Sequence, residues 1–149
     1  ATGCNKSPTE IPQRDADGTE IEEFRTQIPM TSNVRSVDLK GRILRFVLRV
    51  LTLVKQLPDN RINRIFVEQI VRSASSIGSN YEEADGTPTK KDFIYKMGVV
   101  KKEAKETKYW LKLIRLTNNN QYWKEIDETG LENEELIRIF AKIIINAGH

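Results

Sequence analysis

The sequence predicts an all-α fold, an antiparallel up-down-up-down four-helix bundle. Apolar residues recur at steps of three and four along four segments, which is the period of an amphipathic helix. Clusters of proline, glycine or asparagine separate these segments by short connectors, so consecutive helices are expected to be antiparallel neighbours. No segment shows the strict alternation of apolar and polar residues that marks a half-buried strand.

The composition is typical of one ordinary globular domain. The chain has 149 residues, of which 38% are hydrophobic and 30% are charged. The only cysteine, Cys4, has no disulfide partner, and no Cys/His cluster has the spacing of a zinc site. No segment approaches the roughly 18 uninterrupted apolar residues of a membrane span, and no export signal is recognisable. We expect a cytoplasmic protein with no membrane association and no cofactor.

The distribution of charge divides the chain after residue 37. Residues 1–37 carry four basic and six acidic side chains, contain Pro8, Pro12 and Pro29, and show little apolar periodicity. Such a segment buries too little surface to offset its loss of conformational entropy, which predicts a flexible N-terminal tail. Residues 38–149 carry 20 basic and 15 acidic side chains and are expected to form the bundle.

The first predicted helix, from Asp38 onward, has more apolar surface than one core face requires. Its polar residues form only a narrow stripe. The apolar residues that widen its surface are Leu44, Val47, Leu48, Leu51 and Val54. Two interpretations remain open: these residues form a subunit interface, or the helix is central and its own chain covers them.

Turn and capping residues mark the second helix. Pro58 ends the first helix, and Asp59 or Asn60 is expected to cap the second, which should run to about Ala84. The middle of this helix, SASSIGS, is rich in small side chains. This favours close approach of a neighbouring helix over a phosphate-binding loop, because no strand precedes it and no glycine-rich lysine motif is present.

The third predicted helix is the longest. Thr89 followed by Asp92 resembles a capping box at its start, and the run Asn118 to Asn120 ends it. A connector with one helical turn then leads to a fourth helix from Leu131 to about Ala147. The third helix carries a seam in four-three alternation, typical of bundles: Phe93, Met97, Val100, Ala104, Thr107, Leu111 and Ile114.

The third helix also carries a strong positive charge, with nine basic and three acidic residues between positions 89 and 117. Beside the seam lies a basic ladder of Lys101, Lys105, Lys108, Lys112 and Arg115. A row of cations is suited to a phosphate backbone, where each contact releases a counterion, but such rows are also common on solvated helix faces. Tyr109 and Trp110 are either stacking surfaces for bases or anchors of the core.

No arrangement of residues in the sequence favours an enzyme. The sole histidine, His149, is the last residue, a poor place for a catalytic base that must be held in position. The carboxylates lack the Glu-x-x-His pairs of di-iron bundles. We therefore expect no catalytic and no metal-binding residues.

The second and third helices carry a pattern that resembles a known family. The segments RSASSIGSNYEEADG and KKDFIYKMGVVKKEAKETKYWLKLI are similar to small proteins encoded by intervening sequences in bacterial 23S ribosomal RNA genes, the S23-like family. The resemblance covers roughly residues 38–147. The residues that carry it most clearly are Arg72, Asn80, Glu83, Asp92, Phe93, Glu103, Glu106 and Trp110.

The resemblance implies a bundle that assembles into a homopentamer and has no established enzymatic activity. A more distant resemblance, by fold and charge, links the chain to the accessory protein of diversity-generating retroelements, which binds nucleic acid and a reverse transcriptase. We therefore expect an oligomeric accessory protein that binds RNA or DNA through the basic ladder. The alternative is a protein-interaction scaffold without nucleic-acid binding, for example a partner of a reverse transcriptase.

Overall fold

The computed structural model describes residues 35–149, with side chains from residue 38 onward. This part of the chain contains no strand, so the predicted all-α class is confirmed. Its elements are α2 (Arg35–Gln56), α3 (Arg61–Asp85), α4 (Lys90–Thr117), the 3₁₀ turn η1 (Asn120–Tyr122) and α5 (Trp123–Ala147). The flexible tail predicted for residues 1–37 lies outside the described residues, apart from residues 35–37, which belong to α2.

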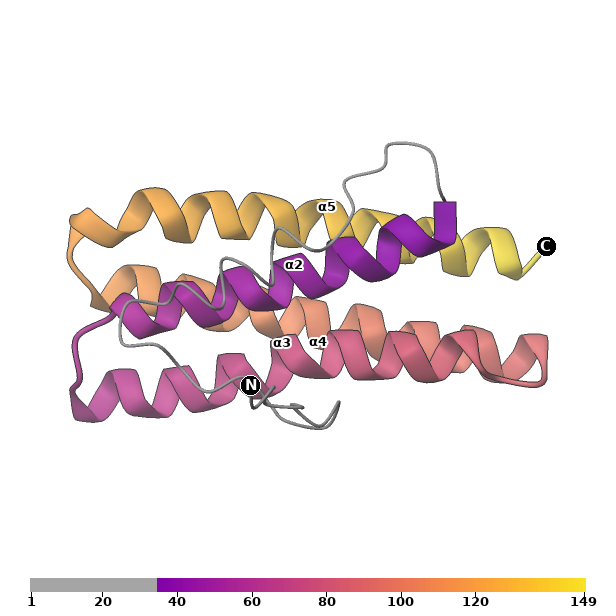
Figure 1. Ribbon diagram of the computed structural model, residues 1–149, viewed down its shortest axis with the longest axis horizontal. Helices are drawn as coiled ribbons and strands as arrows, with labels where there is room; N and C mark the ends of the chain where they lie inside the picture. Colours follow the sequence, from indigo (N-terminus) through magenta and orange to yellow (C-terminus); the bar gives the residue numbers. More distant parts are fainter. Residues whose placement is uncertain (1–34) are drawn as a thin grey trace, which may run out of the picture. The chain divides into compact units, whose positions relative to one another are not determined.

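The four helices form a bundle in which consecutive helices run in opposite directions, as Figure 1 shows. Short connectors join them at the two ends. α2 packs against α3 and α5, and α4 packs against the same two helices on the other side. The contact between α3 and α4 is the most extensive of the contacts between helices in the bundle.

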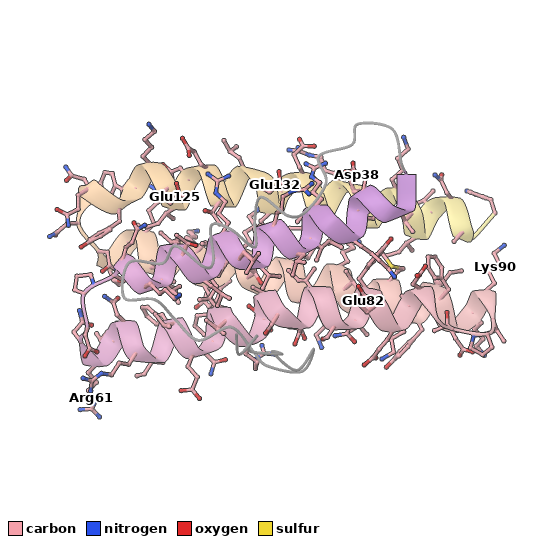
Figure 2. All side chains as sticks on the ribbon, viewed as in Figure 1. Asp38, Arg61, Glu82, Lys90, Glu125 and Glu132 are labelled. Carbon is pink, nitrogen blue, oxygen red and sulfur yellow. The ribbon has the colours of Figure 1, made fainter. Side chains whose placement is uncertain are left out.

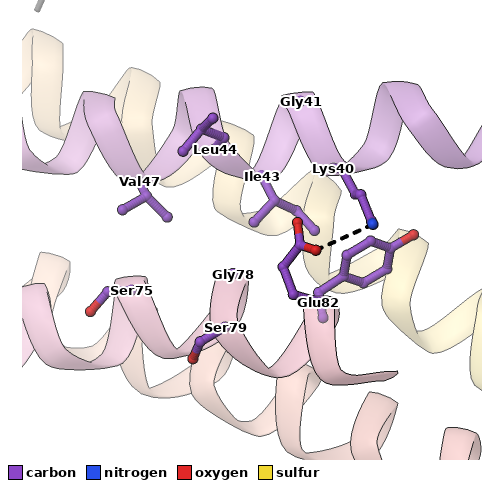
Figure 3. Close-up of a pocket in the computed structure, with 10 residues that line it drawn as sticks. Lys40, Gly41, Ile43, Leu44, Val47, Ser75, Gly78, Ser79 and Glu82 are labelled. Carbon is purple, nitrogen blue, oxygen red and sulfur yellow. Dashed lines mark ion pairs between the residues drawn. The ribbon is translucent and has the colours of Figure 1, made fainter. Parts of the chain in front are cut away.

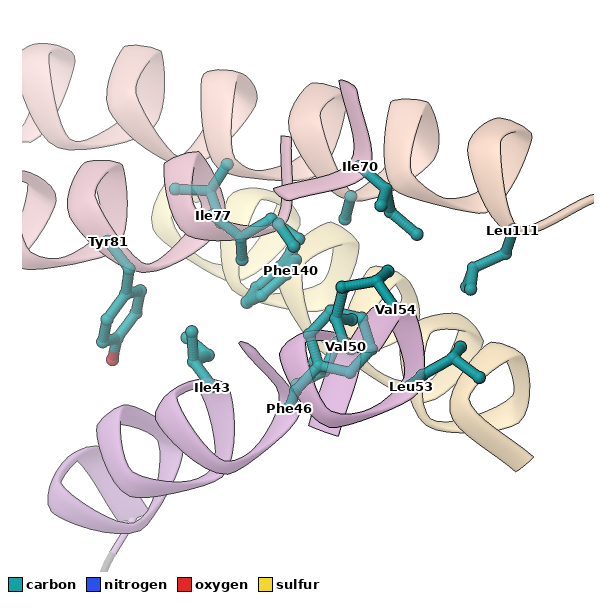
Figure 4. Packing of buried hydrophobic residues seen from close by; sticks show 14 of the residues in the cluster. Ile43, Phe46, Val50, Leu53, Val54, Ile70, Ile77, Tyr81, Leu111 and Phe140 are labelled. Carbon is teal, nitrogen blue, oxygen red and sulfur yellow. The ribbon is translucent and has the colours of Figure 1, made fainter. Parts of the chain in front are cut away.

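The core lies between the four helices and contains side chains from each of them (Figure 4). The seam predicted for the third helix is buried in α4 except for Phe93, which is half-buried. The largest fully buried apolar side chains are Phe46, Phe140, Ile43, Leu53, Ile70, Ile77, Met97, Ile114 and Leu136. Removing this apolar surface from water is the main stabilising contribution to the bundle.

Side-chain caps begin two of the helices, as the sequence predicts. The Asn60 side chain accepts a hydrogen bond from the Asn63 backbone N–H at 2.8 Å, so Asn60 and not Asp59 caps α3. The Thr89 hydroxyl accepts one from the Asp92 N–H at 3.1 Å at the start of α4. Each cap satisfies an amide that has no partner within its helix.

The prediction that the fourth helix begins at Leu131 is wrong, because α5 begins at Trp123. Gly130 suggests a turn in the sequence, yet it lies inside α5, where a side chain would meet open space. A glycine inside a helix costs about 1 kcal/mol, which the buried residues on both sides of it offset. These continue one core face across the glycine: Ile126, Thr129, Asn133, Leu136 and Phe140.

Asn133 is the most unusual member of this buried face. Its amide nitrogen donates to the Ala104 carbonyl of α4 at 2.9 Å. Its amide oxygen is buried and has no hydrogen-bond partner. Buried polar atoms without a partner are uncommon and destabilising. The Asn133 side chain therefore joins α4 to α5 through its amide nitrogen, while its unpaired oxygen lowers the stability of the fold.

Candidate nucleic-acid interface

α4 has polar residues on both sides of its buried seam. Because residues three and four apart share a helix face, the seam turns inward while one polar side lies toward α5 and the other toward α3. Lys108 and Arg115 contact α5, whereas Glu103 and Glu106 contact α3. In the middle of α4 the two acidic residues therefore face α3, away from the lysines of the basic ladder.

Two of the five cations in the basic ladder are paired with α5. Lys108 Nζ lies 2.6 Å from a Glu134 carboxylate oxygen. Arg115 donates to both carboxylate oxygens of Asp127, at 2.8 and 3.3 Å, and its guanidinium lies 4.2 Å from the centre of the Trp123 ring. Because Arg115 bridges α4 to the start of α5, we assign it a structural role.

The other three ladder residues, Lys101, Lys105 and Lys112, form no ion pair with any described residue. Lys105 and Lys112 are exposed and Lys101 is half-buried. Lys102 is also exposed on α4 and also unpaired within residues 38–149. Lys102 lies outside the ladder proposed from the sequence because it falls beyond the arc beside the seam. These four lysines thus lie farther from α5 around the axis of α4 than the two paired cations do.

Arg72 of α3 binds both acidic residues in the middle of α4. One guanidinium nitrogen lies 3.4 Å from Glu103, and another forms a close contact with Glu106. The hydrogen bond from Arg72, with a smaller contribution from the Trp110 indole, lowers the pKa of the Glu106 carboxyl, although partial burial opposes this shift. The Glu106 carboxylate therefore stays ionised at neutral pH, and Arg72 holds both acidic side chains on the α3 side of α4.

The two adjacent aromatic residues Tyr109 and Trp110 have different environments. Trp110 is half-buried, lies 6.0 Å from Phe66 of α3 between ring centres, and donates to Glu106 at 3.3 Å. Tyr109 is 55% exposed. The role of core anchor fits Trp110, while the Tyr109 ring lies edge-on to Trp110 at 5.3 Å between ring centres and keeps more than half of its surface exposed.

The remaining residues of the family pattern also act at the junction of α3 and α4. Glu83 pairs with Lys96 of α4, and Asp92 belongs to the cap of α4. Asn80 donates to the Ser76 carbonyl at 2.8 Å, and Phe93 packs on the core. Seen together with Arg72, Glu103, Glu106 and Trp110, the pattern reflects helix pairing and capping.

The predicted interface on α2 is only partly on the surface. Val54 is buried in the core, which corrects its assignment to the outer face of the helix. Leu44 is 40% exposed, and Val47, Leu48 and Leu51 are half-buried. Each of these four residues, which we call the α2 apolar face, is left at least partly exposed by the described part of the chain.

Two arginines of the polar stripe of α2 pair with acidic residues of α5. Arg42 donates to both oxygens of Glu132, at 2.6 and 3.1 Å. Arg49 donates to Glu125 and to Glu128, each at 2.9 Å. Figure 2 shows Glu125 and Glu132 along α5 beside α2. These two ion-pair groups join α2 to α5 on the side of α2 away from the α2 apolar face.

A hollow of about 330 Å³ adjoins the α2 apolar face (Figure 3). It lies between α2 and α3, and its lining includes Leu44, Val47, Ser75, Gly78 and Ser79. The small residues predicted to allow close helix approach differ in their environment. Ser73 and Ala74 are buried, as that prediction requires. Gly78 has room for a side chain, because a Cβ at this position would lie in ordinary contact, 3.7 Å from Ile43. The glycine widens the hollow and is not required for packing.

No helix in the described part of the chain has the length and apolar content to cross a membrane. Residues 38–149 contain no group of three or more His, Cys, Asp or Glu side chains positioned to hold a metal ion.

Comparison with known proteins places the chain in a family. The family model described as 23S rRNA-intervening sequence protein matches residues 35–142. The chain belongs to this family. A solved structure that is 32% identical, a protein of unknown function from the S23 ribosomal protein family of Bacteroides thetaiotaomicron, matches 70% of this chain and 96% of its own length, with a TM-score of 0.63. A comparison with curated proteins gave no significant match.

Proposed function

We propose that this intervening-sequence family protein is a non-enzymatic, oligomeric accessory protein that binds nucleic acid through α4. The observation that carries the proposal is the one-sided charge of this helix. Glu103 and Glu106 are bound to Arg72 on the α3 side, so they do not neutralise Lys101, Lys105 and Lys112. Unpaired cations along one helix provide sequence-independent attraction for a phosphate backbone.

The test replaces Lys101, Lys105 and Lys112 with glutamine and measures binding to structured RNA and to DNA over a salt series. Each phosphate contact contributes about 0.7–0.9 to the slope of log K against log salt concentration. We expect the slope to fall by roughly 2 and the affinity at low salt to fall at least about tenfold. Fluorescence anisotropy with labelled nucleic acid gives both quantities.

A matched triple variant, with Lys55, Lys124 and Lys142 changed to glutamine, removes the same charge from exposed positions on α2 and α5. It should leave the slope within about 0.5 of the parent, because only contacted phosphates release counterions. Equal loss in both variants would mean that net charge alone drives binding. Absence of binding to RNA and DNA at low salt would overturn the proposal and favour the protein-interaction scaffold.

We also propose that the α2 apolar face forms the contact between copies of the chain. Two of its four residues, Leu44 and Val47, line the hollow between α2 and α3, and a contiguous apolar surface of this kind is typical of a protein interface. The family resemblance makes a homopentamer the expected assembly. A reverse transcriptase, the other partner expected from the resemblance, remains a prediction.

The oligomer prediction is tested by changing Leu44 and Leu48 together to glutamate. A charged side chain on each copy opposes desolvation of the contact, so we expect a lower oligomer or a monomer in sedimentation velocity, with unchanged helical content. The control changes Leu131 and Ile145 of α5, both highly exposed, to glutamate and should retain the parent assembly. A parent protein that is monomeric at micromolar concentration, or a Leu44/Leu48 variant that retains the parent mass, would contradict the interface.

A further inference from the structure

The outer face of α4 combines lysines with exposed aromatic rings. Residues seven apart on a helix differ by only about 20° in direction, so Tyr95, Lys102 and Tyr109 lie along one line. Lys105 and Lys112 lie beside that line, both on its α5 side. Tyr95 is 70% exposed and Tyr109 is 55% exposed, and neither ring is among the side chains packed on the core. We use the term outer face of α4 for these five residues together with Gly98.

Gly98 is an independent sign that this face receives a ligand. It lies in the middle of α4, between Tyr95 and Lys102, where a glycine costs about 1 kcal/mol relative to alanine. A Cβ at this position would have no neighbouring atom within 4 Å. Packing within the described chain therefore does not require the glycine. Because Gly98 has no side chain, the helix backbone beside the Tyr95 ring stays accessible.

The dimensions of the face fit a short run of nucleotides. Tyr95 and Tyr109 are 14 residues apart, which is about 21 Å along the helix axis. At the stacked spacing of about 3.4 Å per nucleotide, this length corresponds to roughly six nucleotides, within the range of about 4–16 that single-strand binding folds cover. Lys102 and Lys105 lie between the two rings, where a backbone passing from one ring to the other would run.

We propose that the outer face of α4 binds single-stranded nucleic acid, with bases stacked on Tyr95 and Tyr109 and phosphates bound by Lys102, Lys105 and Lys112. This inference rests on the nucleic-acid binding proposed above and specifies the form of the ligand. Lysines alone attract single strands and duplexes alike. The rings add a preference for single strands over duplexes. A base within a duplex has both faces covered by its neighbours, whereas an unpaired base offers a face for stacking.

The test compares 15-nucleotide oligo(U) and oligo(dT) with an RNA duplex of the same length, using fluorescence anisotropy at fixed salt. In the double variant Tyr95→Leu and Tyr109→Leu, we expect single-strand affinity to fall at least about tenfold, since base–aromatic stacking contributes about 1–3 kcal/mol per base. Duplex affinity and the salt slope should change less than about twofold, because every lysine is retained. Similar losses for oligo(U) and oligo(dT) would show that the 2′-hydroxyl is not read.

A second variant, Gly98→Leu, separates binding from folding. Leucine has a higher helix propensity than glycine, so thermal stability should stay the same or rise. Single-strand affinity should nevertheless fall at least about threefold, because the new side chain obstructs approach to the ring of Tyr95. A control change, Leu131→Ala, lies at an exposed position of α5 and should not affect binding.

The outcomes distinguish this inference from the proposed function. If the lysine variants weaken binding but the tyrosine and Gly98 variants do not, nucleic-acid binding stands and single-strand stacking is wrong. If the tyrosine variant weakens duplex and single-strand binding equally, the rings give no preference and the inference also fails. If the parent binds none of the three ligands, both proposals fail together.

Discussion

Replacement of Phe140 by alanine should lower the free energy of unfolding by about 3–5 kcal/mol. The Phe140 ring is fully buried, and Figure 4 shows it reaching from α5 into the cluster that contains Ile43 and Ile77. Alanine removes the apolar surface of the ring and leaves a cavity that the neighbouring helices fill only in part. Urea denaturation followed by circular dichroism, at one fixed protein concentration, measures the change.

The matched control for this prediction is Ile145→Ala on the same helix. Ile145 is 61% exposed, so its truncation removes little buried surface and should change the free energy of unfolding by less than about 0.5 kcal/mol. A loss below about 1 kcal/mol for Phe140→Ala would contradict the assignment of this ring to the centre of the core.

Replacement of Asn133 by aspartate should have an effect of similar size. The change keeps the shape of the side chain but removes the N–H group that donates to the Ala104 carbonyl at 2.9 Å. At neutral pH it also places an unpaired carboxylate in a fully buried position. A buried charge without a partner destabilises a fold by about 3–5 kcal/mol, which denaturation by urea at pH 7 would reveal.

The effect of Asn133→Asp should depend on pH in a definite direction. Burial disfavours the ionised form, so the pKa of the new carboxyl is raised above its unfolded value of about 3.9. The folded variant then holds its proton more tightly than the unfolded chain. Its deficit relative to the parent should be smallest below about pH 4, grow as pH rises, and level off once the folded carboxyl is ionised.

Two controls complete this experiment. Asn119→Asp introduces the same charge at an exposed position and should change stability by less than about 0.5 kcal/mol at any pH. Asn133→Leu removes the unsatisfied amide oxygen and introduces no charge, so it should remain within about 1 kcal/mol of the parent. A deficit for Asn133→Asp that does not vary with pH would show that the buried charge is not its cause.

The sequence predicts those parts of the fold that depend on local patterns. The apolar seam of the third helix coincides with the buried face of α4 because one period of apolar residues extends through the whole segment. The caps at Asn60 and Thr89 are likewise local, because each side chain bonds to an amide three residues away. Patterns of this kind do not depend on which helix lies alongside.

The start of α5 shows where local patterns mislead. Gly130 indicates a turn when its neighbours alone are considered. The steps from Ile126 to Thr129 and on to Asn133, however, continue the three-four period of the following apolar residues. Two of these three positions are polar, which hides the period from an analysis of apolar residues. Their burial becomes evident only when α4 supplies the Ala104 carbonyl as a partner for Asn133.

The candidate site could be predicted only in outline, because pairing between helices decides which charges are available. The sequence places five cations in a ladder but does not indicate that Glu134 and Asp127 of α5 pair with two of them. It also shows Glu103 and Glu106 as acids close to the ladder, although Arg72 holds them on the opposite side of α4. Such pairings depend on how the helices are rotated in the bundle, which no single segment specifies.

The separation of charge on α4 by Arg72 also bears on how a ligand arrives. A helix with cations on one side and bound carboxylates on the other produces an electric field with a direction, which orients a polyanion during diffusion and raises its association rate. The field extends only about a Debye length, near 8 Å at physiological ionic strength and 30 Å at 0.01 M salt. Arg72, although it lies on α3 and faces away from the lysines, therefore helps to set the orientation in which a nucleic acid first meets the protein.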